Sequence, residues 1–361
     1  MAIQTMNAVV FRGPFNISVE RKAKPQIKQQ TDAIVRVKSA GICGSELHMY
    51  RGHQKTGTGH IMGHEFVGTV EQVGGKVIDF QPGDSVVAIF SPVCMKCWYC
   101  VRGLTNRCVE GTAFGTQQLD GGQAEFVRVP FADGTLQRVP PELDDRLLIM
   151  MCDIFPTGYY GASRAIEGLC NQLESPLTSK SKLLFDQTIV VLGCGPVGIC
   201  AIATILSKGV RRIYAVDSVE DRLKEAEQLG ATSLKLGQDD IEETIMAVTD
   251  GRGADAVVEV VGNQDALRSA FNLLRPCGIL SSVGFHQSEL PFTGLDCYLK
   301  NITVNFGRVP VRTVFNDALE CLKQNEAKLK TYVSHELDLK DASEGFAMFA
   351  QHKARKVILR V

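Results

Sequence analysis

The stretch that organises this chain is G-I-C-G-S-E-L-H at residues 41–48, followed by G-H-E-F-V-G-T-V-E-Q-V-G-G-K-V at residues 63–77. Cys43 offers a thiolate, His64 an imidazole and Glu65 a carboxylate, and Zn²⁺ accepts these three kinds of donor together. Cys43 and His64 are too far apart in the sequence for one helical turn, so a folded sheet has to bring them together. The stretch therefore predicts a preorganised metal site with an open position, built on strands.

The spacing G-H-E-x2-G-x5-G-x2-V over residues 63–77 resembles the zinc motif of the medium-chain, zinc-dependent alcohol dehydrogenases. The resemblance covers nearly the whole chain, because further motifs follow in the family's order. It implies an α/β protein with three parts. These are a GroES-like, β-rich catalytic domain at 1–158, a doubly wound parallel Rossmann sheet that binds NAD at 159–308, and a segment at 309–361 that returns to the catalytic domain.

Length and composition exclude several other classes of protein. A chain of 361 residues with 45% hydrophobic residues can bury two cores, and its net charge of −1 leaves no basic surface for nucleic acid. The uncharged run at 189–206 is interrupted by glycines, so a strand, a turn and a buried helix explain it better than a membrane span. The first residues show no secretory signal, and we expect a cytoplasmic protein with reduced thiols.

Four cysteines at Cys94, Cys97, Cys100 and Cys108 lie within fifteen residues of one another. Four thiolates at this spacing complete the tetrahedral coordination of a structural zinc ion. The alternative, four free surface thiols, would leave four oxidisable groups side by side. The family resemblance also places a structural zinc on such a lobe, here residues 94–108.

A glycine-rich turn after a predicted strand at 188–192 indicates a dinucleotide site. In this motif the first glycine makes the turn, the second lets the backbone approach the pyrophosphate, and the third allows close helix packing. Asp217 ends the next strand, where its carboxylate is expected to accept hydrogen bonds from the adenosine ribose hydroxyls. Its negative charge would repel a 2′-phosphate, so NAD is favoured over NADP. Alternatively, Asp217 caps the following helix. Arg222 could contact the adenosine end of the cofactor or could be only a charge on the helix surface. The predicted cofactor residues are Thr157, Gly193, Gly195, Pro196, Val197, Gly198, Asp217 and Arg222.

A catalytic zinc needs a third protein ligand beside Cys43 and His64. In the segment C-D-I-F-P-T-G at 152–158, the family's register places this ligand four residues before Thr157, which selects Asp153 and not Cys152. Glu65 is the alternative third ligand. Otherwise Glu65 lies behind the metal, where it tunes the field or exchanges in during turnover.

The resemblance further implies a proton relay in which the Ser45 hydroxyl takes the alcohol proton and passes it through the cofactor ribose to His48. A turn residue and a surface histidine are the alternative interpretations of Ser45 and His48. Glu46 is expected to pair with Arg355 from the C-terminal segment and to brace the site.

We therefore predict an oxidoreductase with two zinc ions that transfers a hydride between NAD and a small alcohol or aldehyde. Residues 153–158 resemble the glutathione-independent formaldehyde dehydrogenase branch. A polyol, secondary-alcohol or threonine-type dehydrogenase is one alternative, and a non-catalytic dinucleotide-binding protein is another. We expect a homo-oligomer, no nucleic-acid or membrane partner, and an insertion at 167–186 relative to the family.

Overall fold

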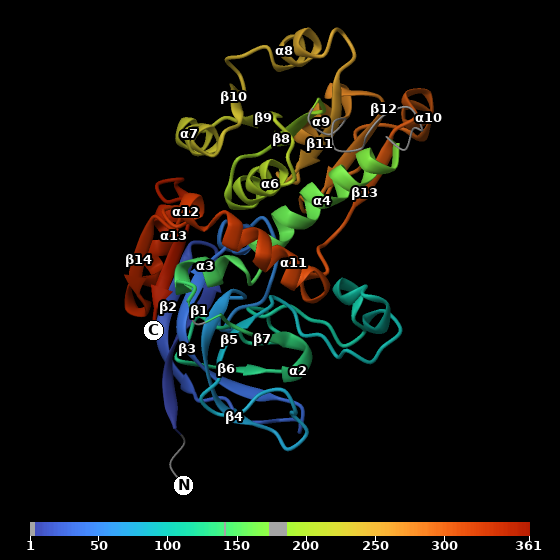
Figure 1. Ribbon diagram of the computed structural model, residues 1–361. Coiled ribbons are helices and arrows are strands. Elements are labelled where there is room, and N and C mark those ends of the chain that lie inside the picture. The colour runs from blue at the N-terminus through green and yellow to red at the C-terminus, as the bar shows by residue number, and fades with distance from the viewer. Residues whose placement is uncertain (1–3, 141, 173–185) are drawn as a thin grey trace. The chain divides into compact units, whose positions relative to one another are not determined.

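The computed structural model describes residues 4–140, 142–172 and 186–361, which divide into two compact units (Figure 1). Unit 1 consists of Met1–Asp153, Pro310–Asn316 and Leu329–Val361, and unit 2 consists of Ile154–Val309 and Asp317–Lys328. The chain thus leaves unit 1 for unit 2 and later returns to it. Residues 173–185, most of the predicted insertion, lie outside the described residues.

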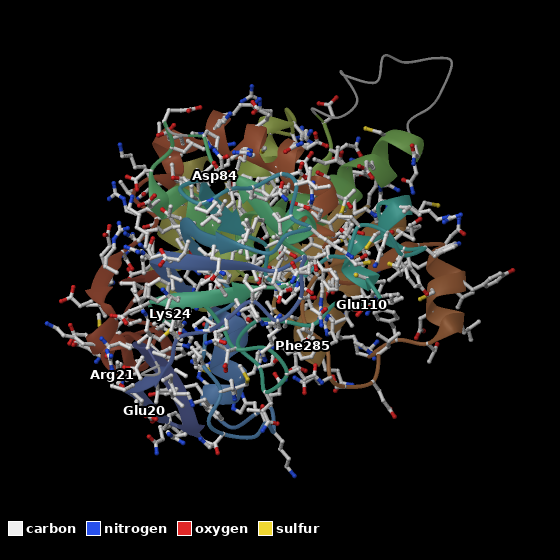
Figure 2. The ribbon with its side chains drawn as sticks, turned by 90° about the horizontal axis from the view of Figure 1, so that it is seen from below. Glu20, Arg21, Lys24, Asp84, Glu110 and Phe285 are labelled. Carbon is white, nitrogen blue, oxygen red and sulfur yellow. The ribbon has the colours of Figure 1, made fainter. Side chains whose placement is uncertain are left out.

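Unit 1 is built on β-sheet, as the valine- and isoleucine-rich segments predict. A hairpin of β1 (Thr5–Gly13) and β2 (Asn16–Ala23) carries the charged residues Glu20 and Arg21 on its surface (Figure 2). A larger sheet has the strand order β14-β15-β3-β4-β5-β7, and β6 also pairs with β3. Its strands are β3 (Ala33–Ile42), β4 (Phe66–Val73), β5 (Ser85–Ala88), β6 (Phe126–Val129), β7 (Leu136–Arg138), β14 (His335–Asp338) and β15 (Val357–Arg360).

Two pairings in this sheet bring distant segments of the chain together. Strands β3 and β4 are antiparallel, with Ala40 opposite Phe66, so the end of β3 meets the start of β4. Strand β15 pairs with the other edge of β3, with Val357 opposite Ile42. The helical segments of unit 1 are α1 (Gly44–Tyr50), η1 (Cys100–Arg102), η2 (Thr105–Arg107), α2 (Ala132–Thr135), α3 (Asp145–Met150), η3 (Leu339–Asp341) and α13 (Ala342–Ala350).

Unit 2 contains a parallel sheet of six strands in the order β10-β9-β8-β11-β12-β13. Its central strands are buried along their whole length, as expected when helices cover both faces of a parallel sheet. The strands are β8 (Thr188–Leu192), β9 (Arg212–Asp217), β10 (Thr232–Lys235), β11 (Ala254–Glu259), β12 (Leu274–Ser282) and β13 (Thr303–Phe306). The strand order reverses between β8 and β11, which is where doubly wound sheets bind their ligands.

The helices of unit 2 connect these strands. They are α4 (Ile154–Gln172), α6 (Pro196–Ser207), α7 (Glu220–Leu229), α8 (Ile241–Val248), α9 (Gln264–Leu273) and α10 (Gly294–Lys300), while α11 (Val311–Gln324) and α12 (Glu326–Leu329) follow β13. The uncharged run at 189–206 folds as β8, a turn and α6, as predicted. None of the helices in the described ranges combines the length and the apolar character that a bilayer crossing requires.

Candidate metal and cofactor sites

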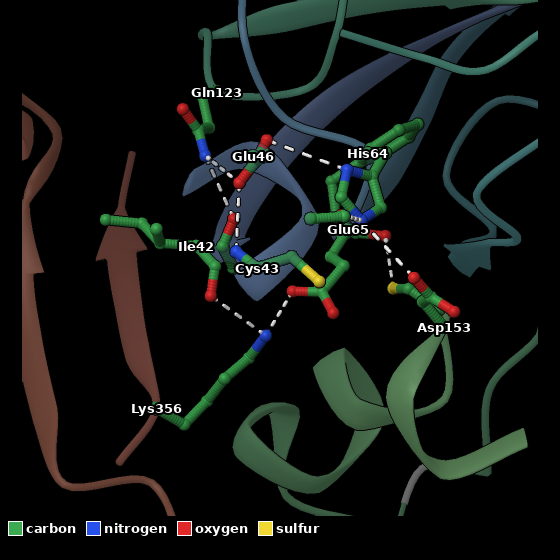
Figure 3. A network of polar contacts seen from close by, with 12 residues as sticks. Ile42, Cys43, Glu46, His64, Glu65, Gln123, Asp153 and Lys356 are labelled. Atoms are coloured by element: carbon green, nitrogen blue, oxygen red, sulfur yellow. Dashed lines mark hydrogen bonds and ion pairs between the residues drawn. The ribbon is translucent and has the colours of Figure 1, made fainter. Parts of the chain in front are cut away.

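Unit 1 brings Cys43, His64, Glu65 and Asp153 together, with one donor atom of each within 4.8 Å of the others (Figure 3). We call these four residues the mixed-donor group. Cys43 lies between β3 and α1, and His64 and Glu65 directly precede β4. Because β3 and β4 are antiparallel neighbours, both segments lie at the same end of the sheet. Asp153 follows α3 and completes the group, so a soft, a borderline and two hard donors converge, as a zinc site requires.

His64 lies between the other donors and a supporting carboxylate. Its Nε2 is 3.4 Å from Asp153 Oδ2 and its Nδ1 is 3.6 Å from Glu46 Oε1. Burial lowers the pKa of His64, but the neighbouring Cys43 and Asp153 charges outweigh burial and hold this pKa well above its usual value. A divalent cation at Nε2 would neutralise this concentration of negative donors, and the Glu46 carboxylate would orient the ring from behind. The residues present therefore fit zinc.

Glu46 also holds the backbone of the first ligand. Its Oε2 accepts a hydrogen bond of 2.9 Å from the Cys43 N–H and one of 3.4 Å from Gln123 Nε2, and the same Gln123 amide donates to the Gly41 carbonyl. The predicted partner Arg355 instead donates from its guanidinium to the carbonyl of Thr331. Glu46 is therefore braced by Gln123, a residue that the sequence motifs do not single out.

The residue that reaches the site from the C-terminal segment is Lys356. Its ammonium group binds Glu65 Oε2 and donates to the Ile42 carbonyl at 3.1 Å, and both side chains of the ion pair are fully buried. Glu65 Oε1 has no hydrogen-bond partner among the described residues. Sequence reasoning missed Lys356, because only the pairing of β15 with β3 places it beside Glu65.

The cysteines Cys94, Cys97, Cys100 and Cys108 form a second group, with their sulfur atoms within 4.8 Å of one another. We call them the four-cysteine group. The Sγ–Sγ separations of Cys100 are 3.4 Å to Cys97 and 4.0 Å to Cys94, and tetrahedral zinc with Zn–S bonds of about 2.3 Å requires about 3.8 Å. Backbone N–H groups of Val109 and Cys100 lower the pKa of Cys97 to about 6. The group thus fits a closed zinc site.

The glycine-rich turn of unit 2 has the close contacts that its sequence predicts. Gly193 has a φ of +94°, and a Cβ at Gly198 would lie 1.8 Å from the Gly193 carbonyl oxygen. Gly195 caps α6, and among the described residues no atom beyond its two chain neighbours lies within 4 Å of where its Cβ would stand. Pro196 and Val197 begin the helix. A bare backbone before a helix N-terminus is the arrangement that binds a pyrophosphate.

The other three predicted cofactor residues, Asp217, Arg222 and Thr157, belong to segments that contact this turn or the start of α6. The Asp217 carboxylate accepts hydrogen bonds from Cys194 N at 2.8 Å and Val219 N at 2.9 Å, and Arg222 lies 3.4 Å from it. Asp217 therefore ties the end of β9 to the glycine-rich turn. Thr157 precedes Gly158, where a Cβ would lie 2.5 Å from the Val197 carbonyl oxygen, so α4 packs closely on the start of α6.

The two residues of the predicted relay lie on α1. Ser45 Oγ is exposed and lies 3.4 Å from His64 Nε2. His48 follows three residues later, which places it on the same face of the helix as Ser45. Burial lowers the pKa of His48, and the charges of His53 and Arg51 lower it further. A neutral imidazole of this kind can accept a proton.

Comparisons with known proteins agree with this geometry. Residues 29–140 match the alcohol dehydrogenase GroES-like domain and residues 196–324 match the zinc-binding dehydrogenase family. The chain is 43% identical over 357 residues to zinc-type alcohol dehydrogenase B of Aspergillus flavus, covering 98% of this chain and 81% of that relative. It is 47% identical over 301 residues to the medium chain reductase/dehydrogenase ucsI of Acremonium sp, covering 82% of this chain and 100% of the relative.

Among solved structures, alcohol dehydrogenase TADH from Thermus sp. ATN1 superposes with a TM-score of 0.89 at 35% identity, covering 99% of this chain and 100% of that one. These matches confirm the predicted combination of a GroES-like domain with a Rossmann-type parallel sheet. The chain therefore belongs to the zinc-type alcohol dehydrogenase family and is a zinc-dependent oxidoreductase that acts on alcohols.

Proposed function

We propose that the protein oxidises a small alcohol reversibly with NAD, and that Cys43, His64 and Asp153 hold the catalytic zinc. The observation that carries this proposal is the convergence of these three donors beside the exposed Ser45 hydroxyl, with Glu65 held from behind by Lys356. We further propose a catalytic domain at 1–158, which the segment 309–361 rejoins, and a cofactor domain at 159–308; most of the first lies in unit 1 and most of the second in unit 2.

The contacts of the two carboxylates favour Asp153 as the third ligand. Asp153 is partly exposed and its Oδ2 lies 3.4 Å from the nitrogen of His64 that faces the donors. Glu65 already shares its charge with Lys356, and removing a carboxylate from a buried ion pair is costly. Glu65 is then a supporting residue. The ion pair with Lys356 fixes its carboxylate, and its Oε1 has no hydrogen-bond partner among the described residues.

The protein's own residues supply orientation and proton transfer. Zinc and NAD, when bound, supply a Lewis acid for the substrate oxygen and the hydride acceptor. Glu46 holds the Cys43 backbone and the His64 ring, so these donors keep their geometry in the free enzyme. Ser45 Oγ accepts the proton of the substrate hydroxyl and releases its own hydroxyl hydrogen toward His48, whose pKa burial lowers.

The cofactor preference is proposed from Asp217. A carboxylate at the end of β9 can accept hydrogen bonds from the ribose hydroxyls, and its negative charge repels a 2′-phosphate. We expect Asp217→Ser to raise the KM for NAD and to lower the ratio of kcat/KM with NAD to kcat/KM with NADP. An unchanged ratio would contradict the role of Asp217. The remaining cofactor residues are proposed as Thr157, Gly193, Gly195, Pro196, Val197, Gly198 and Arg222.

The proposed reaction is tested with a panel of alcohols, polyols and aldehydes, offered with NAD and NADP while absorbance at 340 nm is followed. Metal analysis of the same preparation should give about two zinc ions per chain, one in each donor group. Ser45→Ala should slow turnover and leave the zinc content unchanged. A preparation that holds both zinc ions and oxidises no alcohol of the panel would contradict the proposal.

The unpartnered Oε1 of Glu65 favours one second candidate function. If Glu65 is the resting third ligand, the site resembles the polyol dehydrogenase branch, and a polyol or secondary alcohol becomes the proposed substrate. The same panel separates the two candidates, because a polyol dehydrogenase should oxidise polyols with a higher kcat/KM than simple primary alcohols.

We also propose a homo-oligomer in the cytoplasm. Strand β13 forms an edge of the sheet of unit 2, and exposed apolar side chains lie on it, on α10 and at Phe285 (Figure 2). An apolar edge strand in a free monomer would be prone to aggregation, whereas pairing with a second copy would cover it. Sedimentation velocity should therefore show a species larger than 39.4 kDa. A monomer at micromolar concentration would contradict this proposal.

A further inference from the structure

Glu259, Ser282 and His286 form a buried polar cluster in unit 2 that lies outside the sites described above. Glu259 ends β11, Ser282 ends β12, and His286 follows on the next turn. Ser282 Oγ donates to Glu259 Oε2 at 2.7 Å, and His286 Nε2 lies 2.9 Å from both of these oxygens. Glu259 is fully buried. A buried acidic side chain has to be compensated by hydrogen bonds, and the Glu259 carboxylate has four donors: Ser282, His286 and the backbone N–H groups of Val261 and Gly262. We call these three residues the Glu259 cluster.

The hydrogen-bond pattern determines what His286 does in the Glu259 cluster. Ser282 has one hydroxyl hydrogen and gives it to the carboxylate, which has none to give. His286 Nε2 therefore carries a hydrogen and donates it. The ring of His286 also packs edge-on against Phe306, with ring centroids 5.8 Å apart. His286 thus ties the turn after β12 to Glu259 through a donated hydrogen bond.

Glu259 also connects to the glycine-rich turn through the backbone that follows β11. Its Oε1 accepts hydrogen bonds of 2.7 Å from both Val261 N and Gly262 N, which fixes the turn after β11. The side chain of Val261 packs against Gly193, where a Cβ would lie 2.7 Å from Val261 Cγ2. The glycine-rich turn after β8 therefore rests on backbone that Glu259 holds in place.

The turns after β11 and β12 are in direct backbone contact. Gly262 has a φ of +80°, and a Cβ there would lie 2.5 Å from Phe285 N, while a Cβ at Gly284 would lie 2.4 Å from Gly262 N. Neither turn has room to shift independently. The Glu259 cluster thus connects the turns after β8, β11 and β12, which all lie at the carboxyl edge of the parallel sheet.

We propose that the Glu259 cluster positions these three turns for the nicotinamide half of the dinucleotide, with His286 as the positioning residue. A doubly wound sheet binds one nucleotide half on each side of its switch point. Asp217, on β9, serves the adenosine half, so the β11 and β12 side serves the other half. This inference rests on the proposed NAD-binding function of unit 2.

The test compares the binding of NADH with that of AMP, which occupies the adenosine half alone, in the full zinc-loaded enzyme. His286→Ala removes a hydrogen bond to a charged group and should raise the NADH Kd, measured by fluorescence titration, about tenfold. The AMP Kd, measured by competition, should stay within about twofold of wild type. His286→Gln, which keeps a side-chain N–H donor, should restore the NADH Kd to within about threefold.

Arg275→Gln is the matched control, because Asp255 and the partly buried Arg275 form an ion pair of 2.5 Å across the same two strands at the amino edge of the sheet. It should lower the Tm about as much as His286→Ala but leave the NADH Kd unchanged. If His286→Ala does not fold, Ser282→Ala takes its place, with an expected rise in the NADH Kd of about threefold.

Three results would overturn the inference. These are an unchanged NADH Kd in a folded His286→Ala, an equal rise of the NADH and AMP Kd values, or an equal rise of the NADH Kd in Arg275→Gln. A wild-type enzyme that binds no NADH would overturn the proposed cofactor function as well. A wild-type enzyme that binds NADH together with any of the three results would overturn only the role of the Glu259 cluster.

Discussion

The four-cysteine group and the mixed-donor group are built by different means in the same unit. The cysteines lie within one short lobe and offer identical donors. Short 3₁₀ turns form part of this lobe, and backbone N–H groups donate to the Cys97 sulfur. The mixed-donor group joins residues from Cys43 to Asp153 and is supported by buried charges on Glu46 and Lys356. A closed structural site needs only matched ligands, whereas a catalytic site with an open position needs its ligands held by the surrounding fold.

This difference predicts different consequences of substitution. Loss of a ligand from the four-cysteine group should affect mainly that lobe and its contact with Thr313, because its four ligands all lie within residues 94–108. In the mixed-donor group, the three kinds of change should have different effects. Loss of a ligand should release the metal, loss of Glu65 should slow turnover, and loss of Lys356 should lower the stability. The four predictions below use this separation and run from the largest expected effect to the smallest.

The largest effect is expected for Asp153→Asn, which keeps the side-chain volume but weakens the donor and removes its charge. Catalytic zinc should be lost, and kcat/KM should fall by more than the roughly 10- to 100-fold that is usual for supporting residues. Glu65→Gln is the matched variant and should slow turnover with zinc retained. Zinc analysis and steady-state kinetics check both variants. The reverse ranking would make Glu65 the resting ligand and favour the polyol dehydrogenase reading.

Lys356→Met should be the most destabilising of the single changes behind the metal. It leaves the fully buried Glu65 carboxylate unpaired, which costs about 3–5 kcal/mol in the free energy of unfolding. Lys24→Met, which breaks a partly exposed ion pair with Glu71, should cost less than about 1 kcal/mol. The double change Glu65→Leu and Lys356→Met should recover part of the stability, because no buried charge remains. Urea unfolding of the three variants tests the order, and equal losses for the two lysines would contradict it.

Cys97→Ser should release the zinc of the four-cysteine group and leave the catalytic zinc bound. A loss of about 2 kcal/mol would lower the Tm by roughly 4–8 °C, with kcat/KM within about threefold of wild type. Cys277→Ser, at an exposed cysteine outside both groups, should change neither zinc content nor Tm. Loss of both zinc ions from a folded Cys97→Ser protein would show that the two groups are not independent.

The smallest effect is expected in the dependence of the Tm on pH. It concerns the surroundings of the mixed-donor group alone, because residues 94–108 contain no histidine. Burial lowers the pKa of His48 in the folded protein, while the unfolded chain takes up the proton near pH 6.5. The wild type should therefore lose stability as the pH falls below about 6.5. His48→Gln removes the group, so its Tm should fall less between pH 8 and pH 5, by no more than about 2 °C. Identical pH profiles would contradict the depressed pKa.

Much of the architecture could be predicted from the sequence, because it rests on local patterns. The uncharged run at 189–206 contains a strand, a glycine-rich turn and a helix, and the structure forms β8 and α6 there. The valine-rich stretch after Glu65 forms β4. The predicted pairing of Glu46 with Arg355 was wrong in its partners, since Glu46 accepts from the Cys43 backbone and Gln123. Strand alternation does not reveal which of two adjacent basic residues points inward when the strand's neighbour is unknown.

The sequence by itself determined which chemical groups are available and which of them are close along the chain. The cysteines at 94–108 and the glycine-rich turn at 193–198 are local, so their spacing already limits their geometry. Only the tertiary structure placed Lys356 behind Glu65, Gln123 against Glu46, and His286 beside Glu259. These contacts join segments separated by many residues, and their energies depend on burial and on strand register. Burial and register exist only once the sheets have formed, which is why the sequence leaves them undecided.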